Sequence, residues 1–209
     1  MKMAAQHISE SDLANILTLH HRRLGWGTLL ASVTADRNAG FPCEKEEFFI
    51  RRELKKASQK VSDWFYNQGQ KNNWPSMEGW MWEIDFALSK AVPKKQASNV
   101  NDKDAEPAEG AIMTLGEIDT GIISRLIEKT TALEDEVRSH LRLHLEGNFS
   151  MENLNQIIEE FGAANENVHN WFSEMAKKYN WPPLKDSRWI YYADTEEGKI
   201  YIRRTQRNL

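Results

Sequence analysis

The sequence predicts a mainly α-helical protein made of two tandem copies of one helical unit, with a small β-hairpin at its C-terminal end. Three observations predict this fold class: an ungapped internal repeat, apolar residues at helical spacing in both copies, and a polar segment between them. We expect a first unit at residues 8–92, a flexible linker at 93–113, and a second unit with the hairpin at 114–209.

The internal repeat appears when the chain is compared with itself at an offset of 107 positions, which places residues 8–82 on residues 115–189. Seventeen of these 75 aligned pairs are identical, and the rare residues among them keep a fixed order. The most characteristic identical pairs are Trp64/Trp171, Phe65/Phe172, Asn73/Asn180, Trp74/Trp181, Pro75/Pro182 and Trp82/Trp189. The two copies are therefore expected to share one fold.

The first helix of each copy is predicted to start at a capping box and to end at a glycine. The expected caps are Ser9 and Thr114, and the expected terminal glycines are Gly40 and Gly147. Gly25 and Gly27 interrupt the apolar stripe of the first copy, which is therefore weaker than that of the second copy.

The second helix of each copy shows the clearer amphipathic pattern. Apolar residues recur at steps of three and four at Ile50, Leu54, Ala57, Val61 and Trp64, and at Ile157, Phe161, Ala164, Val168 and Trp171. An Asn-Trp-Pro sequence is expected to end each of these helices, because asparagine tolerates a left-handed backbone and proline cannot continue a helix.

Strand-forming residues follow the helices of both copies. Residues 188–192 and 199–204 flank a glycine-containing turn and predict a hairpin. Residues 80–84 predict a single strand in the first copy, for which pairing with the hairpin of the second copy is one option. The linker between the copies is polar and has few large apolar side chains, which is typical of chain that buries too little surface to become ordered.

Composition excludes several classes of protein. The net charge is −4, with 12 Lys and Arg against 16 Asp and Glu in residues 114–209, so neither copy has the basic excess of a typical nucleic-acid binder. Cys43 is the only cysteine, and no apolar run reaches the roughly 18 residues of a membrane span. We expect an intracellular protein, cytoplasmic or nuclear, without a secretory signal, a membrane span or a cofactor.

Two clusters carry chemically versatile side chains. His140 and His144 lie four residues apart, on one helix face with Glu136, and histidines at this spacing occur in zinc sites. They are the weak metal candidates of this chain, and the alternative is a solvated helix face. The segment 20–23, His-His-Arg-Arg, is a basic cluster suited to phosphates or to an acidic partner.

The Trp-Phe block resembles a homeodomain over about residues 41–71 and 148–178. Phe41-Pro42 precedes a Val-x-x-Trp-Phe-x-Asn sequence that ends at Asn67, with the spacing of that family. The resemblance implies that Asn67 reads adenine, that Lys71 contacts phosphate, and that Arg22 and Arg23 form a basic arm. Glu174 stands at the asparagine position of the second copy, where a carboxylate would repel phosphates.

These observations leave three functional hypotheses. The first is a non-enzymatic interaction protein whose duplicated helical unit binds a macromolecular partner, with a protein as the expected partner. The second is a DNA-associated regulator with homeodomain-like units, and the third is a metal-dependent enzyme. We favour the first, because most residues shared by the copies have structural explanations and neither a Gly-rich phosphate loop nor a Gly-x-Ser-x-Gly elbow is present.

Overall fold

The computed structural model describes residues 5–74, 80–86, 88–95, 109–182, 184 and 189–204. The elements of the first repeat are β1 (Gln6–His7), α1 (Glu10–Asn38), α2 (Glu44–Lys71), β2 (Trp80–Asp85) and β3 (Lys90–Lys95). Those of the second are β4 (Gly110–Thr114), α3 (Glu117–Leu145), α4 (Met151–Lys178), β5 (Trp189–Asp194) and β6 (Lys199–Arg204). Both repeats have the order strand, helix, helix, strand, strand, which confirms a mainly helical, duplicated fold.

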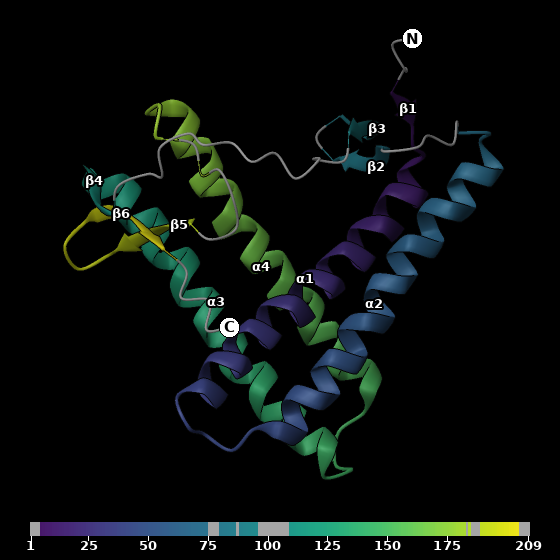
Figure 1. The fold of residues 1–209 in the computed structure, drawn as a ribbon, viewed down its shortest axis with the longest axis horizontal. Helices are drawn as coiled ribbons and strands as arrows, with labels where there is room; N and C mark the ends of the chain where they lie inside the picture. The colour runs from purple at the N-terminus through teal and green to yellow at the C-terminus, as the bar shows by residue number, and fades with distance from the viewer. Residues whose placement is uncertain are drawn as a thin grey trace.

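The two helical hairpins form a V (Figure 1). Their connecting turns lie together at the bottom of the view, α1 crosses α4, and the sheets lie at the two separate upper ends. We call these ends the first and second tips. Of the helices that the structure describes, none combines the length and apolar content needed to cross a membrane.

The N-terminal caps of the first helices are confirmed in one repeat only. Ser9 caps α1, and its side chain accepts a hydrogen bond from the backbone N–H of Asp12 at 3.2 Å. The prediction for Thr114 is wrong, because Thr114 ends β4 and Gly116 is the cap of α3. Backbone pairing with the neighbouring strand takes precedence there over the local capping pattern.

The C-terminal signals of all four helices are confirmed. Gly40 and Gly147 follow the first helices with φ of +93° and +82°, and Asn73 and Asn180 follow the second helices with φ of 52° and 50°. Glycine and asparagine are the residues that adopt this left-handed conformation most readily. The helix ends of the two repeats therefore correspond at an offset of 107 residues.

All four helices are continuous, so each repeat is a hairpin of two long helices rather than a homeodomain-like unit with a turn before a third helix. Residues 56–58 lie within α2, so the turn that a homeodomain has before its third helix is absent from that place. The equivalent part of α4 is also helical. The structure consists of two long-helix hairpins, α1 with α2 and α3 with α4.

Each repeat carries its own antiparallel sheet, with the order β1-β3-β2 in the first and β4-β6-β5 in the second. The strand predicted at residues 80–84 is β2 and pairs with β3 of its own repeat. The predicted C-terminal hairpin is confirmed as β5 and β6. The ends of the predicted linker belong to strands β3 and β4, and residues 96–108 lie outside the described residues.

In the sheets, corresponding residues of the two repeats lie two positions further apart in the sequence than they do in the helices. Trp82 contacts Trp74 with ring centroids 4.9 Å apart, and Tyr191 contacts Trp181 in the same way at 5.0 Å. The structural counterpart of Trp82 is therefore Tyr191, and the sequence pairing of Trp82 with Trp189 is wrong. The longer connection before β5 absorbs the two extra residues.

Among the described residues, three clusters of buried side chains pack the helices and sheets together. Each tip has a tryptophan-rich core between its sheet and its helices, and a central core lies where the hairpins meet. The tip cores contain Ile8, Ile16, Trp64, Trp74 and Ala91 in the first repeat, and Leu115, Ile123, Trp171, Trp181 and Ile200 in the second. The central core contains Trp26, Leu29, Ile50, Val137, Leu141, Leu154, Ile158 and Phe161.

The two repeats touch most closely where α1 crosses α4. A Cβ atom added to Gly162 would lie 1.9 Å from the carbonyl oxygen of His21, and one added to Gly25 would lie 2.2 Å from that of Ile158. Only glycine permits this approach of two helix backbones. Gly25, which interrupts the apolar stripe of the first copy, is required by the packing of the two repeats.

Candidate interaction surfaces

The basic cluster of residues 20–23 lies at the crossing of the two repeats. Arg22 forms an ion pair with Glu159 of α4. Nε2 of His21 is 2.6 Å from one carboxylate oxygen of Glu166, and Nε2 of His20 is 3.5 Å from the other. Three of the four basic residues therefore contact α4 rather than forming a free arm for phosphates.

The four residues predicted to bind nucleic acid do not form one surface. Asn67 is exposed on α2, and Nζ of Lys71 is 3.4 Å from a carboxylate oxygen of Asp12 at the first tip. Arg22 lies ten residues beyond Asp12 in α1, a distance of about 15 Å along the helix axis. Arg23, next to it, is exposed.

The two metal-candidate histidines are held by backbone and aromatic contacts. Nδ1 of His140 lies 2.8 Å from the carbonyl oxygen of Glu136, and Nδ1 of His144 lies 2.7 Å from that of Phe149. The His140 ring packs on Phe149, and the His144 ring packs on Phe49. Within the described residues, no three His, Cys, Asp or Glu side chains converge as metal ligands.

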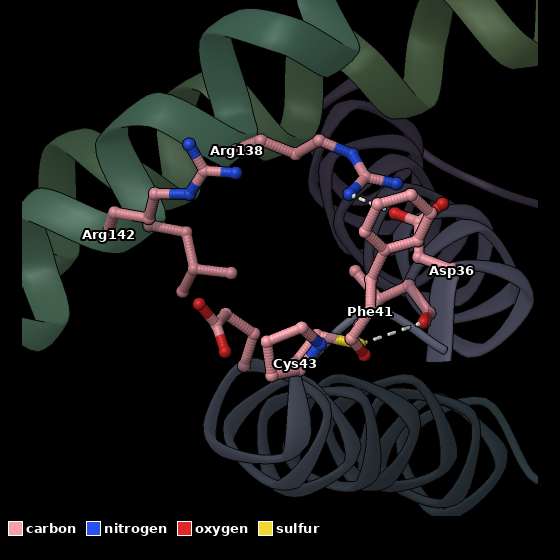
Figure 2. Close-up of a pocket in the computed structure, with 9 residues that line it drawn as sticks. Asp36, Phe41, Cys43, Arg138 and Arg142 are labelled. Atoms are coloured by element: carbon pink, nitrogen blue, oxygen red, sulfur yellow. Dashed lines mark hydrogen bonds and ion pairs between the residues drawn. The ribbon is translucent and has the colours of Figure 1, made fainter. Parts of the chain in front are cut away.

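A cavity of about 270 Å³ opens at the base of the V, between the α1–α2 turn and α3. Figure 2 shows Arg138 and Arg142 reaching toward it from α3, with Asp36, Phe41 and Cys43 on the opposite side. Arg138 is neutralised, since its guanidinium donates to Asp36 at 2.7 Å and also pairs with Glu134. The cavity thus has an apolar wall and a charged rim.

The thiol of Cys43 in this cavity stays protonated at neutral pH. Burial raises its pKa, and the carboxylates of Asp36, Glu44, Glu46 and Glu47 raise it further. The thiol donates a hydrogen bond to the carbonyl oxygen of Val33 at 3.3 Å. A nucleophilic cysteine requires a lowered thiol pKa, so this environment does not favour thiolate chemistry.

The helix turn beside the cavity differs from the equivalent turn of the second repeat. In the second repeat Phe149 packs against the central core with its ring 4.3 Å from that of His140. The equivalent position in the first repeat is Pro42, and the neighbouring Phe41 is 63% exposed. The phenylalanine thus comes one residue earlier in the first repeat, where Phe41 and Pro42 both line the cavity.

The outer face of the second sheet is aromatic and cationic. The guanidinium carbon of Arg203 lies 3.9 Å from the ring centroid of Tyr192 and 5.4 Å from that of Tyr201. Ile190 is 43% exposed beside them, in register with Arg203. We call these four residues the tyrosine–arginine face. The period-two pattern of residues 189–192 is the sequence signal that could have separated this face from the buried one.

The outer face of the first sheet has a different chemistry. Its residues at the positions of Tyr192 and Arg203 are Glu83 and Lys94, which form an ion pair of 2.7 Å. Val92 takes the place of Tyr201. The hairpins β2–β3 and β5–β6 share their register, so at these positions the contrast lies in the exposed side chains.

No family model, curated protein or solved structure matches this chain.

Proposed function

We propose that this chain is a non-enzymatic interaction protein whose second tip binds a protein partner. The observation that carries the proposal is the tyrosine–arginine face on the outer side of the second sheet. Tyrosine and arginine are enriched among the residues that contribute most to protein–protein binding, because each buries a large surface while keeping a polar group available.

The contrast between the tips supports this assignment. The ion pair between Glu83 and Lys94 satisfies both charges within the first sheet. Among the described residues, no carboxylate forms an ion pair with Arg203, which rests on two aromatic rings. A partner carboxylate can pair with this guanidinium while apolar groups cover the tyrosine rings.

Charge favours a protein over nucleic acid as the partner. The second repeat carries more acidic than basic residues. Phosphate backbones are bound by clusters of unpaired cations, and binding weakens steeply with salt when such clusters dominate. Two of the residues expected to contact DNA, Arg22 and Lys71, are paired with Glu159 and Asp12.

The proposal is tested by site-specific photo-crosslinking of the full-length protein in its native cell. A photoreactive residue at Tyr201 is expected to capture a defined protein, whereas the same residue at Val92 in the first sheet is the matched control. The capture should fail when Tyr192→Ser and Arg203→Ser are combined, and it should persist when Glu83→Ser and Lys94→Ser are combined. Equal capture from both sheets, or none, would contradict the proposal.

A further inference from the structure

The cavity at the base of the V has two charged side chains on its rim that form no ion pair within the described chain. These are Arg142 of α3, which reaches toward the opening in Figure 2, and Glu46 of α2. The other two charged residues of the lining, Arg138 and Asp36, are paired with each other at 2.7 Å. One positive and one negative group therefore remain available at the same opening.

The interior of this cavity is apolar. Val33 and Leu141 line it and belong to the buried central core. Phe41 and Pro42 form a further part of the wall. The Cys43 thiol is turned to the carbonyl oxygen of Val33, and a protonated cysteine behaves as a small apolar side chain. Pockets for drug-sized molecules measure about 300–1,000 Å³. A cavity of about 270 Å³ is suited to a single ring with a short polar tail.

The second repeat shows which kind of group packs at the corresponding place. At the offset of 107 residues, Val33 corresponds to His140 and Pro42 corresponds to Phe149. The Phe149 ring packs on His140 with centroids 4.3 Å apart and lies against the central core. The first repeat carries no ring at Pro42, and its cavity lies beside Val33. A phenyl ring in this cavity would contact Val33 as Phe149 contacts His140.

We propose that the cavity binds a free aromatic α-amino acid of the size of phenylalanine. The ring enters the apolar interior beside Val33 and Leu141. The carboxylate of the ligand accepts hydrogen bonds from the guanidinium of Arg142, and its ammonium group donates to the carboxylate of Glu46. Hydrogen bonds between groups of opposite charge are the strong ones, so each end of the zwitterion is recognised. This small-molecule site lies apart from the protein contact proposed for the second tip and uses none of its residues.

The two rim charges discriminate against related molecules. An aromatic acid without an ammonium group brings a carboxylate toward Glu46 and leaves that residue unpaired. An aromatic amine brings a cation toward Arg142 and has the same defect. The terminus of a peptide carries only one of the two charges, so the pair of charges favours the free amino acid.

The test uses L-phenylalanine and the full-length protein with carbon-13-labelled methyl groups. The NMR signals of the Val33 and Leu141 methyl groups are expected to shift saturably, with a Kd of about 0.1–1 mM for so small a ligand. Hydrocinnamate lacks only the ammonium group and phenethylamine lacks only the carboxylate, so each should bind about fivefold more weakly. L-Alanine lacks the ring and should leave both signals in place.

Two substitutions separate the roles of the rim charges. Arg142→Gln should weaken L-phenylalanine about fivefold without weakening phenethylamine, which makes no use of this cation. Glu46→Gln should weaken L-phenylalanine by a similar factor without weakening hydrocinnamate. The matched controls are Arg125→Gln on α3 and Glu44→Gln on α2, which remove the same charges at exposed positions outside the cavity lining. Both controls should keep affinity within about twofold, because solvent screens distant charges.

A further variant fills the cavity from within. Phe41→Asn combined with Pro42→Phe gives the first helix turn the Asn-Phe sequence that the second repeat has at residues 148–149. The new ring should occupy the site and abolish the binding of L-phenylalanine. Circular dichroism and thermal unfolding establish that each variant is folded.

Several outcomes would overturn the inference. These are absence of a saturable shift at Val33 and Leu141, equal affinities for the three phenyl compounds, or losses in the two controls that match those at the rim. Unchanged affinity in a folded Phe41→Asn/Pro42→Phe protein would place the ligand outside the cavity and overturn it as well. If that variant does not fold, the rim variants and their controls decide the question. Crosslinking at Tyr201 does not depend on the cavity, so its persistence would leave the proposed function standing while this inference fails.

Discussion

The first helices of the two repeats use the same face in different ways. On α1 the face that runs from Ser11 to Gly25 is covered by α4 only at Arg22, which pairs with Glu159, and at Gly25, the point of closest approach. Its other residues Ser11, Asn15 and Thr18 are exposed. On α3 the face is exposed from Ile118 to Ala132. The helices have equal lengths and corresponding ends, so backbone structure does not account for the difference.

Side chains at the crossing account for it. The residues of α4 that lie on α1 include Ile158, Glu159, Gly162 and Glu166, and their counterparts on α2 are Arg51, Arg52, Lys55 and Gln59. None of these pairs is identical. An α2–α3 crossing equivalent to that of α1 and α4 is thereby prevented, since Lys55 stands where a glycine is needed. Divergence between the copies thus determines how they pack, as well as what their surfaces expose.

The largest effect on this comparison is expected from the substitution Gly162→Ala. The new methyl group would overlap the carbonyl oxygen of His21, so α1 and α4 would have to separate. We expect a loss of about 2–3 kcal/mol in the free energy of unfolding, measured by urea denaturation. The control is Gly69→Ala in α2, where a Cβ meets nothing within 4 Å, and helix propensity predicts a gain of up to about 1 kcal/mol. Unchanged stability of the Gly162→Ala variant would show that the close crossing of α1 and α4 does not require this glycine.

A smaller effect is expected at Arg138, which joins α3 to α1 at the base of the V. Arg138→Ala leaves Asp36 and Glu134 without their shared cation. We expect a loss of about 1–2 kcal/mol, measured in the same way. Arg125→Ala, on the open part of α3, should change stability by less than about 0.5 kcal/mol. Similar losses in the two variants would mean that Arg138 is not a specific contact between the repeats.

The smallest effect concerns the pH dependence of the crossing. Burial lowers the pKa of His20, Arg23 and His21 lower it further, and Glu166 opposes them. The unfolded chain therefore binds the proton more readily than the folded protein. The contribution of His20 is fully present above the unfolded pKa, about 6.5, and declines as pH falls through the lower folded pKa.

Replacing His20 should accordingly flatten the stability profile on the acidic side. Urea midpoints measured between pH 7.5 and 5 should fall less with acidification in His20→Gln than in the wild type. His169→Gln, on the exposed side of α4, is the control and should retain the wild-type slope. Identical slopes in His20→Gln and the wild type would show that this histidine is not linked to folding.

Much of the secondary structure could be predicted because its signals are local. The apolar stripe through Trp64 and the left-handed Asn73 each involve residues within a few turns of one another. The strand β1 was missed because it has only two residues and exists through pairing with β3. The cap at Thr114 was predicted wrongly for the same reason, since that residue belongs to β4 and its sheet.

The candidate surfaces were less accessible to sequence reasoning. The basic residue Arg22 was expected to be free, whereas its partner Glu159 lies 137 residues away in the sequence. Nothing in the periodicity of either helix indicates that the two residues meet. Tyr192 and Arg203 come together through hairpin register, which depends on the turn between β5 and β6.

The sequence by itself determined that this protein is a duplication, where its four helices end, and that tryptophans recur in both copies. Those properties follow from local backbone preferences and from periodic burial, which act within each repeat. Only the tertiary structure decided that α1 receives α4 while the equivalent face of α3 stays open. This difference depends on Gly25 and Gly162, which meet where the repeats cross, and on ion pairs between residues that are distant in the sequence. No local sequence pattern encodes either of them.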